Sequence, residues 1–447
     1  MLFIRFWKLD VSPPGFDLDE MVAAGSVSCF AQTGESVFGV PHPFFFDARV
    51  GSPVSPVFVY MGAAWTRVFG GGIASFRGFA ALFGVLACFG AAIAAYFFRG
   101  YRAAAWTLAV AALSPWSFHF SRIAWDASLA PAFVIFGFVC AIQRGFLWKI
   151  AGGFLLALSA YAYPPLRVHA PLIIVGLLVL LVKRKDPRGA LALVTSAALA
   201  SLPLVWVLLS GNLMVRFGEI GVFSDQYRAL TGGHWYNYPL VFFENYLKHF
   251  SPRFLFISGD SNWRHSTQKF GELGWLDILA LGCGIVLAAK SWARRFRGRS
   301  EKGVPSEGIG IVAWCAATGF VPAALTWESL PHALRSISVW PFWAIAAGCL
   351  LAAFVERYTW SAPAIVVVAL AFSVTFSVAY FRGYPKLSHL HFYVPLKEAA
   401  EQAKRSADWQ GYFETLATYP QGVNFYYPVQ YGGMSCADVR AILAGGK

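Results

Sequence analysis

Long apolar runs recur along the chain, and most are separated by short polar turns. We expect membrane-crossing helices in ten of these runs, at about 78–98, 104–119, 124–142, 150–166, 168–182, 190–210, 275–290, 309–327, 336–354 and 361–380. Crossing a bilayer takes roughly 20 residues, so the shorter runs must be extended by neighbouring residues or lie deeper in the bundle. The pattern predicts an all-α polytopic membrane protein, because helices satisfy their own backbone polar groups in lipid.

Three longer and more polar segments interrupt the apolar runs and divide the chain into five predicted parts. These are a first external loop with amphipathic helices at 1–77, membrane helices at 78–210, a second large external loop at 211–274, membrane helices at 275–380, and a small external domain at 381–447. In the last part we expect a helix at about 395–418 and then strand-like aromatic residues near 424–428. The external loops should therefore carry a small mixed α/β element, whose aromatic residues either bind an acceptor glycan or pack over the loops.

Composition supports the membrane class. Hydrophobic residues make up 57% of the 447 residues and charged residues 13%, whereas a soluble domain carries about 25% charged residues. A soluble enzyme, a coiled coil and a disordered chain are excluded.

The net charge of +13 is a topology signal. If the predicted helices alternate, the basic residues of the short loops fall on one side: Arg99, Arg102, Arg144, Lys149, Lys183, Arg184, Lys185, Arg188, Lys290, Arg294, Arg295, Arg297, Arg299 and Lys302. Such loops are cytoplasmic, so the long polar segments face outward. We expect no nucleic-acid partner, because the basic excess belongs to the topology.

The two chain ends carry further expectations. Residues 1–9 read like the exit of a membrane helix, so we expect either a start that lies further upstream or a truncated chain. An upstream reading frame that encodes about 15–20 more apolar residues would support this expectation. Five of the seven cysteines lie in apolar runs, whereas Cys29 and Cys436 lie in polar segments. A disulfide between those two and a pair of free thiols both remain open, and no C-x-x-C spacing indicates a metal or redox site.

The first external loop contains adjacent carboxylates, Asp19 and Glu20, in the run 13–20. A low-dielectric boundary raises the pKa of such a group, which suits a general base. Alternatively, Asp19 caps a helix over about 20–32. Asp17-Leu18-Asp19 also has the D-x-D spacing of metal–diphosphate sites, although this tripeptide is common by chance.

A second outward turn contains His119, Arg122 and Asp126. Arg122 could bind phosphate while Asp126 pairs with it or holds a cation, or the two could form a self-satisfied pair at i,i+4. A third turn, with Tyr161, Tyr163 and Arg167, is typical of interfacial tyrosines and a snorkelling arginine, which is the interpretation we favour.

Two further turns carry cationic side chains. The segment 258–265 ends in Trp263, Arg264 and His265, and indicates either an anion-binding loop or an ordinary Asx turn. A sugar ring could stack on Trp263 or on the pair at 235–236. Arg335 precedes a helix expected from about 336, where its charge and the free backbone N–H groups would make a phosphate site; a snorkelling arginine is the alternative.

Together these features resemble the GT-C superfamily, most closely its bacterial protein-mannosyltransferase-like and aminoarabinose-transferase-like branch. The resemblance covers most of residues 8–380. It lies in the run 13–20 with the amphipathic helix and Gln32-Thr33-Gly34 after it, in 52–60, in Ser121-Arg122 and in 331–336. It implies a GT-C-like helical bundle in the bacterial cytoplasmic (inner) membrane, with the active site facing the periplasm.

The resemblance also implies an inverting glycosyltransferase, either a hexosyl- or a pentosyltransferase. It would move a sugar from a polyprenyl-phosphate-linked donor to a hydroxyl of an acceptor protein, lipid or glycan. Asp19 would be the general base and Glu20 its partner. Donor phosphate would be bound by Arg264 and Arg335, with Arg122 in reserve, and supported by His265, His332, His119 and Asp126. No all-protein metal cage is recognisable from the sequence, and a divalent cation remains open.

Two other functions compete with the enzyme. A transporter or flippase for lipid-linked glycans needs polar residues well inside the membrane helices, and few are present. A non-catalytic scaffold for glycan assembly is the other alternative.

Overall fold

The computed structural model describes residues 1–46, 53–209, 215–231, 234, 237–296, 306–409, 411–412 and 428–445. Within these ranges the chain is helical, and its only β-structure consists of isolated bridges such as Glu35 with Pro41. The predicted mixed α/β element is therefore not found among the described residues. Most of the strand-like segment predicted near 424–428 lies outside the described residues. The predicted stacking pair at 235–236 and the first residue of the segment 52–60 also lie outside them.

Helices occupy all ten ranges expected to cross the membrane. They are α3 (Ile73–Arg99), α4 (Tyr101–Leu113) with α5 (Pro115–Phe120), α6 (Ala130–Ile142), α7 (Phe146–Ala162), α8 (Leu166–Lys183), α9 (Pro187–Leu209), α13 (Trp275–Phe296), α14 (Ser306–Thr318) with α15 (Val321–Ala324), α16 (Trp340–Arg357) and α17 (Ser361–Val378). Six helical segments of the described chain are long and apolar enough to cross a bilayer. The expectation of a multi-pass membrane protein is confirmed.

Small residues let these helices pack closely. Helix α16 lies against α4, and α7 against α9. A Cβ atom at Gly348 of α16 would collide with Thr107 of α4, and one at Gly153 of α7 would collide with the carbonyl of Leu193 of α9. Close backbone approach at small residues is typical of helix packing in lipid, where the hydrophobic effect no longer drives association.

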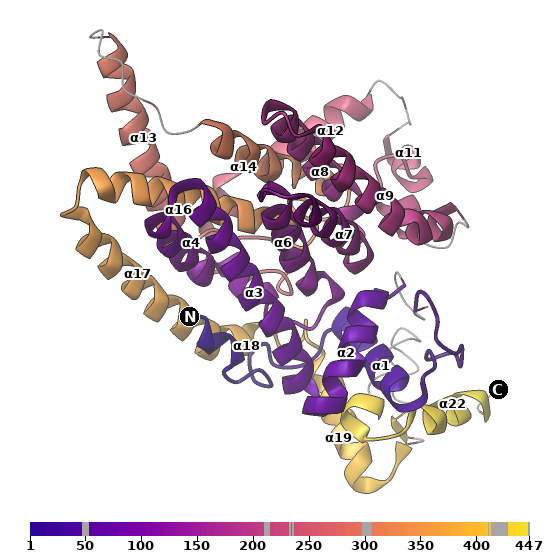
Figure 1. Cartoon of the computed structure of the whole chain (residues 1–447). Helices are drawn as coiled ribbons and strands as arrows, with labels where there is room; N and C mark the ends of the chain where they lie inside the picture. Colours follow the sequence, from indigo (N-terminus) through magenta and orange to yellow (C-terminus); the bar gives the residue numbers. More distant parts are fainter. Residues whose placement is uncertain are drawn as a thin grey trace.

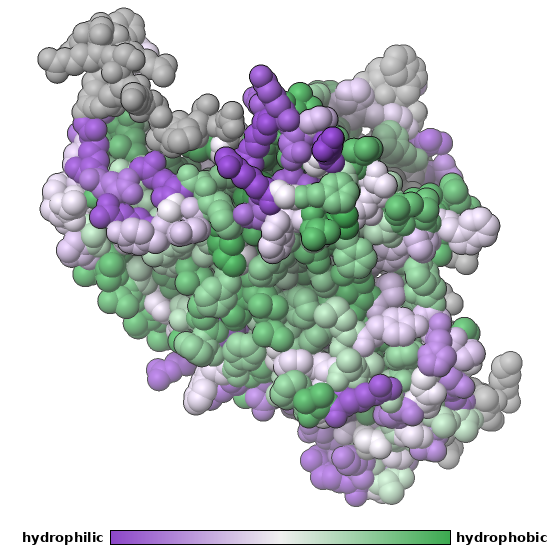
Figure 2. Space-filling view, viewed as in Figure 1, coloured by the Kyte–Doolittle hydropathy of each residue, from purple (hydrophilic) through white to green (hydrophobic). Residues whose placement is uncertain are grey.

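A broad hydrophobic band separates two hydrophilic ends of the molecule (Figure 2). Contacts join the predicted cytoplasmic loops to one another. Arg99 Nη2 lies 2.5 Å from Glu356, the side chain of Lys290 contacts Tyr358, and Arg184 donates to the carbonyl of Ile142 over 2.9 Å. The first two contacts bring Arg99 and Lys290 to residues 356–358, and the third brings Arg184 to the end of α6. Basic loops distant in sequence thus come together in two groups, in agreement with the charge pattern.

The other end is built from α1 (Leu18–Thr33), α2 (Pro56–Phe69), α19 (Val394–Ser406) and α22 (Cys436–Gly445), which lie together at the lower right of Figure 1. Short helices α10 (Val215–Ile220), α11 (Asp225–Thr231), α12 (Asn237–Lys248) and α18 (Tyr384–Ser388) complete the described loops. A disulfide joins Cys29 of α1 to Cys436 of α22, with the two Cα atoms 5.5 Å apart. Of the two alternatives that the sequence left open, the structure has the disulfide and not the pair of free thiols.

Helix α1 differs from its prediction in two respects. Its N-cap is Asp17, whose side chain accepts the backbone N–H of Glu20 over 2.9 Å, so Asp19 is not the cap. The helix is also buried on nearly all sides rather than amphipathic, because α2 and the C-terminal segment cover it. The helix expected at about 395–418 appears as α19 but ends at Ser406.

Candidate active site

A cavity of about 1030 Å³ opens among the loops that connect the helices. Five of the regions that line it are the start of α1, the turn before α6, the turn before α8, and the loops at 261–265 and 328–335. The charged and imidazole side chains in its lining are Asp19, Asp126, Arg167, Arg264, His265, Glu328, His332, Arg335 and His391. Most residues that the sequence selected separately therefore face one space.

Asp19 and Arg264 form an ion pair in this cavity. Asp19 Oδ2 lies 3.5 Å from Arg264 Nη1, and the Asp19 side chain is 62% exposed where it faces the opening. Burial opposes the charge of Arg264, but the carboxylates of Asp17 and Asp19 outweigh burial and raise the pKa of Arg264 above its ordinary value. A cation and an accessible carboxylate thus stand side by side.

Two consecutive side-chain turns shape the loop that carries Arg264. Asp260 accepts the backbone N–H of Asn262, and Asn262 accepts that of Arg264, each over 2.9 Å. These are the Asx turns that the sequence offered as an alternative to an anion-binding loop. The turns present Arg264 and His265 to the cavity, and the anion-binding loop stays a prediction.

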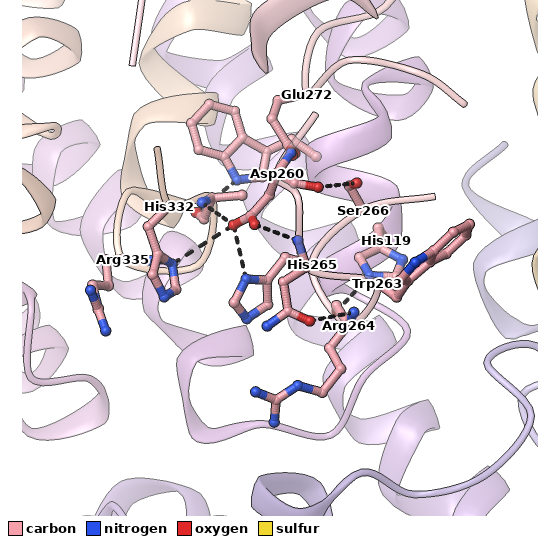
Figure 3. Close-up of polar contacts among 12 residues, drawn as sticks. His119, Asp260, Trp263, Arg264, His265, Ser266, Glu272, His332 and Arg335 are labelled. Atoms are coloured by element: carbon pink, nitrogen blue, oxygen red, sulfur yellow. Dashed lines mark hydrogen bonds and ion pairs between the residues drawn. The ribbon is translucent and has the colours of Figure 1, made fainter. Parts of the chain in front are cut away.

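Asp260 is the buried centre of the polar network drawn in Figure 3. Its Oδ2 accepts from the backbone N–H of Ala333 over 2.8 Å and lies 2.9 Å from His265 Nδ1 and 3.9 Å from His332 Nδ1. Burial favours the neutral acid, but His265 and these backbone donors outweigh burial and lower the pKa of Asp260. Burial and the charge of Arg335 lower the pKa of His332 well below its ordinary value.

His119 supports this loop from beneath and does not line the cavity. Its Nε2 donates to the carbonyl oxygen of Arg264 over 2.8 Å, and its Nδ1 lies 3.2 Å from the hydroxyl of Tyr380. Glu272 accepts the backbone N–H of Asp260 over 2.9 Å from the opposite side. His119 thus positions the backbone of Arg264, and its predicted support of the donor phosphate stays a prediction.

Glu20 points away from the cavity into a buried ion pair. Its carboxylate is bound by Arg77 through two contacts of 2.7 Å and accepts the backbone N–H of Ala124 over 2.8 Å. Arg77 also donates to the carbonyls of Leu9 and Pro13. Adjacent residues of a helix point in different directions, which explains why Asp19 and Glu20 separate.

Arg122 is also withdrawn from the cavity. Its buried guanidinium donates to the backbone carbonyls of five N-terminal residues, Ile4, Arg5, Trp7, Lys8 and Ser12, at 2.7–3.2 Å. Neither the phosphate site nor the i,i+4 pair with Asp126 predicted for it is formed. Asp126 instead accepts the backbone N–H of Ala127 over 2.7 Å at the cavity wall.

Arg335 lies at the cavity but not at the start of an α-helix. A 3₁₀ turn at Ile337–Val339 precedes α16, so the free N–H groups of that helix are further along the chain than predicted. Arg335 Nη1 donates to the hydroxyl of Thr326 over 2.8 Å and to the carbonyl of Glu328 over 2.9 Å. These bonds fix the guanidinium against the wall.

Sequence reasoning missed several lining residues. Arg167, interpreted as a snorkelling arginine, lines the cavity, as do His391 and Tyr393 after α18. The position of Arg167 in an outward turn was the available signal. For His391 and Tyr393 there was none, because their position depends on how the C-terminal segment folds back.

Asp17 was noted only as part of a weak motif. It is fully buried beside Trp125, whose indole nitrogen donates to Oδ1 over 3.1 Å. Burial, with a smaller contribution from the neighbouring Asp19 and Glu20, raises the pKa of Asp17 to about 7. Asp17 therefore acts on Arg264 from within the protein, whereas Asp19 acts from the cavity.

Comparison with known proteins was made at the levels of sequence and fold. No protein-family model matches the sequence, and no curated protein matches it significantly. The solved oligosaccharyltransferase of Archaeoglobus fulgidus in the apo form aligns with 96% of this chain at a TM-score of 0.50 and 13% identity, and the chain covers 59% of that protein's length. Two further structures align at lower TM-scores. ArnT from Cupriavidus metallidurans bound to undecaprenyl phosphate has a TM-score of 0.49, 15% identity and coverage of 98% of this chain and 77% of ArnT. The oligosaccharyltransferase AglB of A. fulgidus with an inhibitory peptide and a dolichol-phosphate has a TM-score of 0.47, 13% identity and coverage of 92% and 58%. The protein therefore has a fold similar to that of the A. fulgidus oligosaccharyltransferase, in agreement with the helical bundle that the motifs predicted.

Proposed function

We propose that the protein is an inverting glycosyltransferase of the outer face of the cytoplasmic membrane. It moves a sugar from a polyprenyl-phosphate-linked donor to a hydroxyl of an acceptor protein, lipid or glycan. The observation that carries the proposal is the single cavity in which an accessible carboxylate, Asp19, lies 3.5 Å from Arg264 and shares the lining with Arg335. The likeness of the fold to an oligosaccharyltransferase supports a glycosyl transfer.

The reaction needs a base and a cationic site. Asp19 takes the proton of the acceptor hydroxyl while the oxygen of that hydroxyl bonds to the anomeric carbon. The bond from that carbon to the phosphate oxygen breaks on the opposite face of the ring. The released polyprenyl phosphate gains negative charge, which Arg264 and Arg335 stabilise. The configuration at the anomeric carbon is inverted because there is one displacement.

The ion pair gives the donor a role in preparing the base. In the free protein Arg264 is bound to Asp19. A donor phosphate competes for the same guanidinium, and its more concentrated charge draws Arg264 away. Asp19 is then free to accept the proton of the acceptor, so the base is released only when a donor is bound.

The cavity also has an apolar part suited to the lipid. Four apolar residues line it together with the charged residues: Leu208 of α9, Ile220 of α10, Pro322 of α15 and Leu325, which follows α15. A polyprenyl chain is apolar and its phosphate is anionic, so one cavity with both kinds of wall matches the donor.

Replacement of Asp19 by Asn is the direct test. The isosteric amide cannot accept the proton, so we expect transfer from a polyprenyl-phosphate sugar to fall by about 10²–10⁴-fold while membrane insertion and donor binding remain. Asp10→Asn, which changes an exposed carboxylate outside the cavity lining, is the matched control. Unchanged transfer in Asp19→Asn would remove Asp19 as the base. A wild-type protein that translocates a lipid-linked glycan but has no transfer activity would favour the flippase.

A further inference from the structure

Three buried side chains that the proposed reaction does not use lie at one wall of the cavity: Asp260, His265 and His332. One potential ligand atom from each lies within 4.8 Å of the other two. Within the described residues this is the group of imidazole and carboxylate side chains whose spacing fits a metal ion. Figure 3 shows the two imidazole rings converging on the Asp260 carboxylate.

The hydrogen bonds leave one contact of this group unexplained. His332 Nδ1 accepts the backbone N–H of Arg335 over 3.3 Å, so this nitrogen carries a lone pair and no proton. It faces Asp260 Oδ2, another electron-rich atom, at 3.9 Å with no hydrogen between them. Two such atoms repel each other when buried, and a cation between them would replace that repulsion with two bonds. Because His332 Nδ1 has one lone pair, its bond to the metal would take the place of the long hydrogen bond from the Arg335 N–H.

We propose that Asp260, His265 and His332 bind a divalent transition-metal ion of the zinc class. Zinc is held by imidazole nitrogen and carboxylate oxygen at about 2.0–2.2 Å, and two imidazoles with one carboxylate form a recurrent three-ligand set. Mg²⁺ and Ca²⁺ prefer oxygen ligands, so the two imidazoles select against them. His265 binds through the same Nδ1 that now faces Asp260 once its proton has moved to Nε2, the other neutral tautomer.

The surroundings of the carboxylate match those of a metal ligand. Asp260 is fixed by the backbone N–H groups of Asn262 and Ala333, and its own N–H is held by Glu272. Hydrogen bonds of this kind orient ligands in metal sites, and their loss typically weakens metal binding about 10–100-fold. The wall is therefore pre-organised around the carboxylate.

The position left open by three protein ligands faces the cavity. His265 and His332 line it beside Arg264 and Arg335. An open coordination position is typical of zinc sites that bind a substrate oxygen, whereas structural zinc sites are closed by a fourth protein ligand. The inference goes beyond the proposed function, since metal binding requires neither Asp19 nor glycosyl transfer.

The test is metal binding by the full-length protein in detergent, after chelator treatment. We expect about one Co²⁺ or Zn²⁺ per chain, with visible Co²⁺ absorption bands of a site containing nitrogen ligands, and a thermal midpoint that rises when Zn²⁺ is added but not when Mg²⁺ is added. His265→Ala and His332→Ala should each weaken binding by at least about 100-fold. His389→Ala, which removes an exposed imidazole outside the group, should leave binding unchanged.

His332→Cys separates ligation from a purely structural role. A thiolate is a zinc and cobalt ligand, so this variant should recover stoichiometric Co²⁺ binding and add a sulfur-to-metal absorption band, which a structural requirement for histidine would not produce. Failure of the wild type to bind either ion, or binding that survives both alanine substitutions, would overturn the proposal. Asp19→Asn should bind metal normally while losing transfer, so failure of the metal site and failure of the proposed function are distinguishable.

Discussion

Replacement of Glu20 by Gln should damage the fold and spare the chemistry. The carboxylate of Glu20 is fully buried, faces Arg77 through two contacts of 2.7 Å and accepts the backbone N–H of Ala124. The amide of Gln keeps one acceptor but points an NH₂ group at the guanidinium. Arg77 would then hold a buried charge without a counterion.

The expected cost follows from the burial of this pair. Removing one partner of a buried ion pair costs about 3–5 kcal/mol. At about 2.1 cal/mol/K of unfolding entropy per residue, a chain of 447 residues loses about 3–5 °C in its thermal midpoint. The matched control is Glu356→Gln, whose partner Arg99 is partly exposed and whose loss should cost about 1 °C or less.

The assay combines two measurements. Thermal unfolding in detergent is monitored by tryptophan fluorescence, and transfer activity is measured at a temperature below the unfolding transition. We expect Glu20→Gln to lower the midpoint while the activity per folded molecule stays near that of the wild type. An unchanged midpoint together with lost transfer would refute the reasoning and return Glu20 to the role of partner to the catalytic base.

Three further outcomes follow from the structure. Asp17→Asn keeps the helix cap but removes a carboxyl group whose pKa burial raises from 3.8 to about 7. Because the folded state holds this proton more tightly than the unfolded state, wild-type stability should fall as the pH rises from about 4 to 7. In thermal midpoints measured across this pH range, the variant should lose that part of the pH dependence. Arg264→Gln should weaken donor binding and transfer about 10–100-fold, because it loses one phosphate contact of about 1.5–3 kcal/mol, whereas Arg228→Gln, at an exposed site, should leave both unchanged in a binding titration; equal donor binding by the two variants would remove Arg264 from the donor site. Cys29→Ser should lower the thermal midpoint of the oxidised protein and abolish the mobility difference between reduced and non-reduced gels, and an unchanged midpoint would mean that the disulfide does not stabilise the fold.

The membrane architecture was predictable because its physical signals are local. Each helix must supply its own apolar surface and satisfy its own backbone groups, so hydropathy alone located all ten helical ranges. The basic loops could be assigned to one end for the same reason. The Asp17 cap could be confused with Asp19 because both residues suit that position, and only the hydrogen bond to Glu20 distinguishes them.

The site was predictable in part because side-chain direction depends on packing. Asp19, Arg264, Arg335, His265, His332 and Asp126 were selected as polar residues at outward turns, and all of them line one cavity. Arg122 and Glu20 carry the same local signals, yet one holds the N-terminal backbone and the other holds Arg77. The local sequence pattern around a charged residue at a membrane boundary is the same whether that residue binds a substrate or another segment of the chain.

The Cys29–Cys436 bond spans 407 residues of sequence. The thiol of Cys29 leaves the ribosome long before its partner, and the six helical segments of the described chain that are long enough to cross a bilayer are made in between. Covalent closure between α1 and α22 therefore follows the synthesis of nearly the whole given sequence, and it depends on an oxidising compartment. Until then Cys29 on α1 has a free thiol, which can form a mixed disulfide with a small thiol or with a cysteine of another protein.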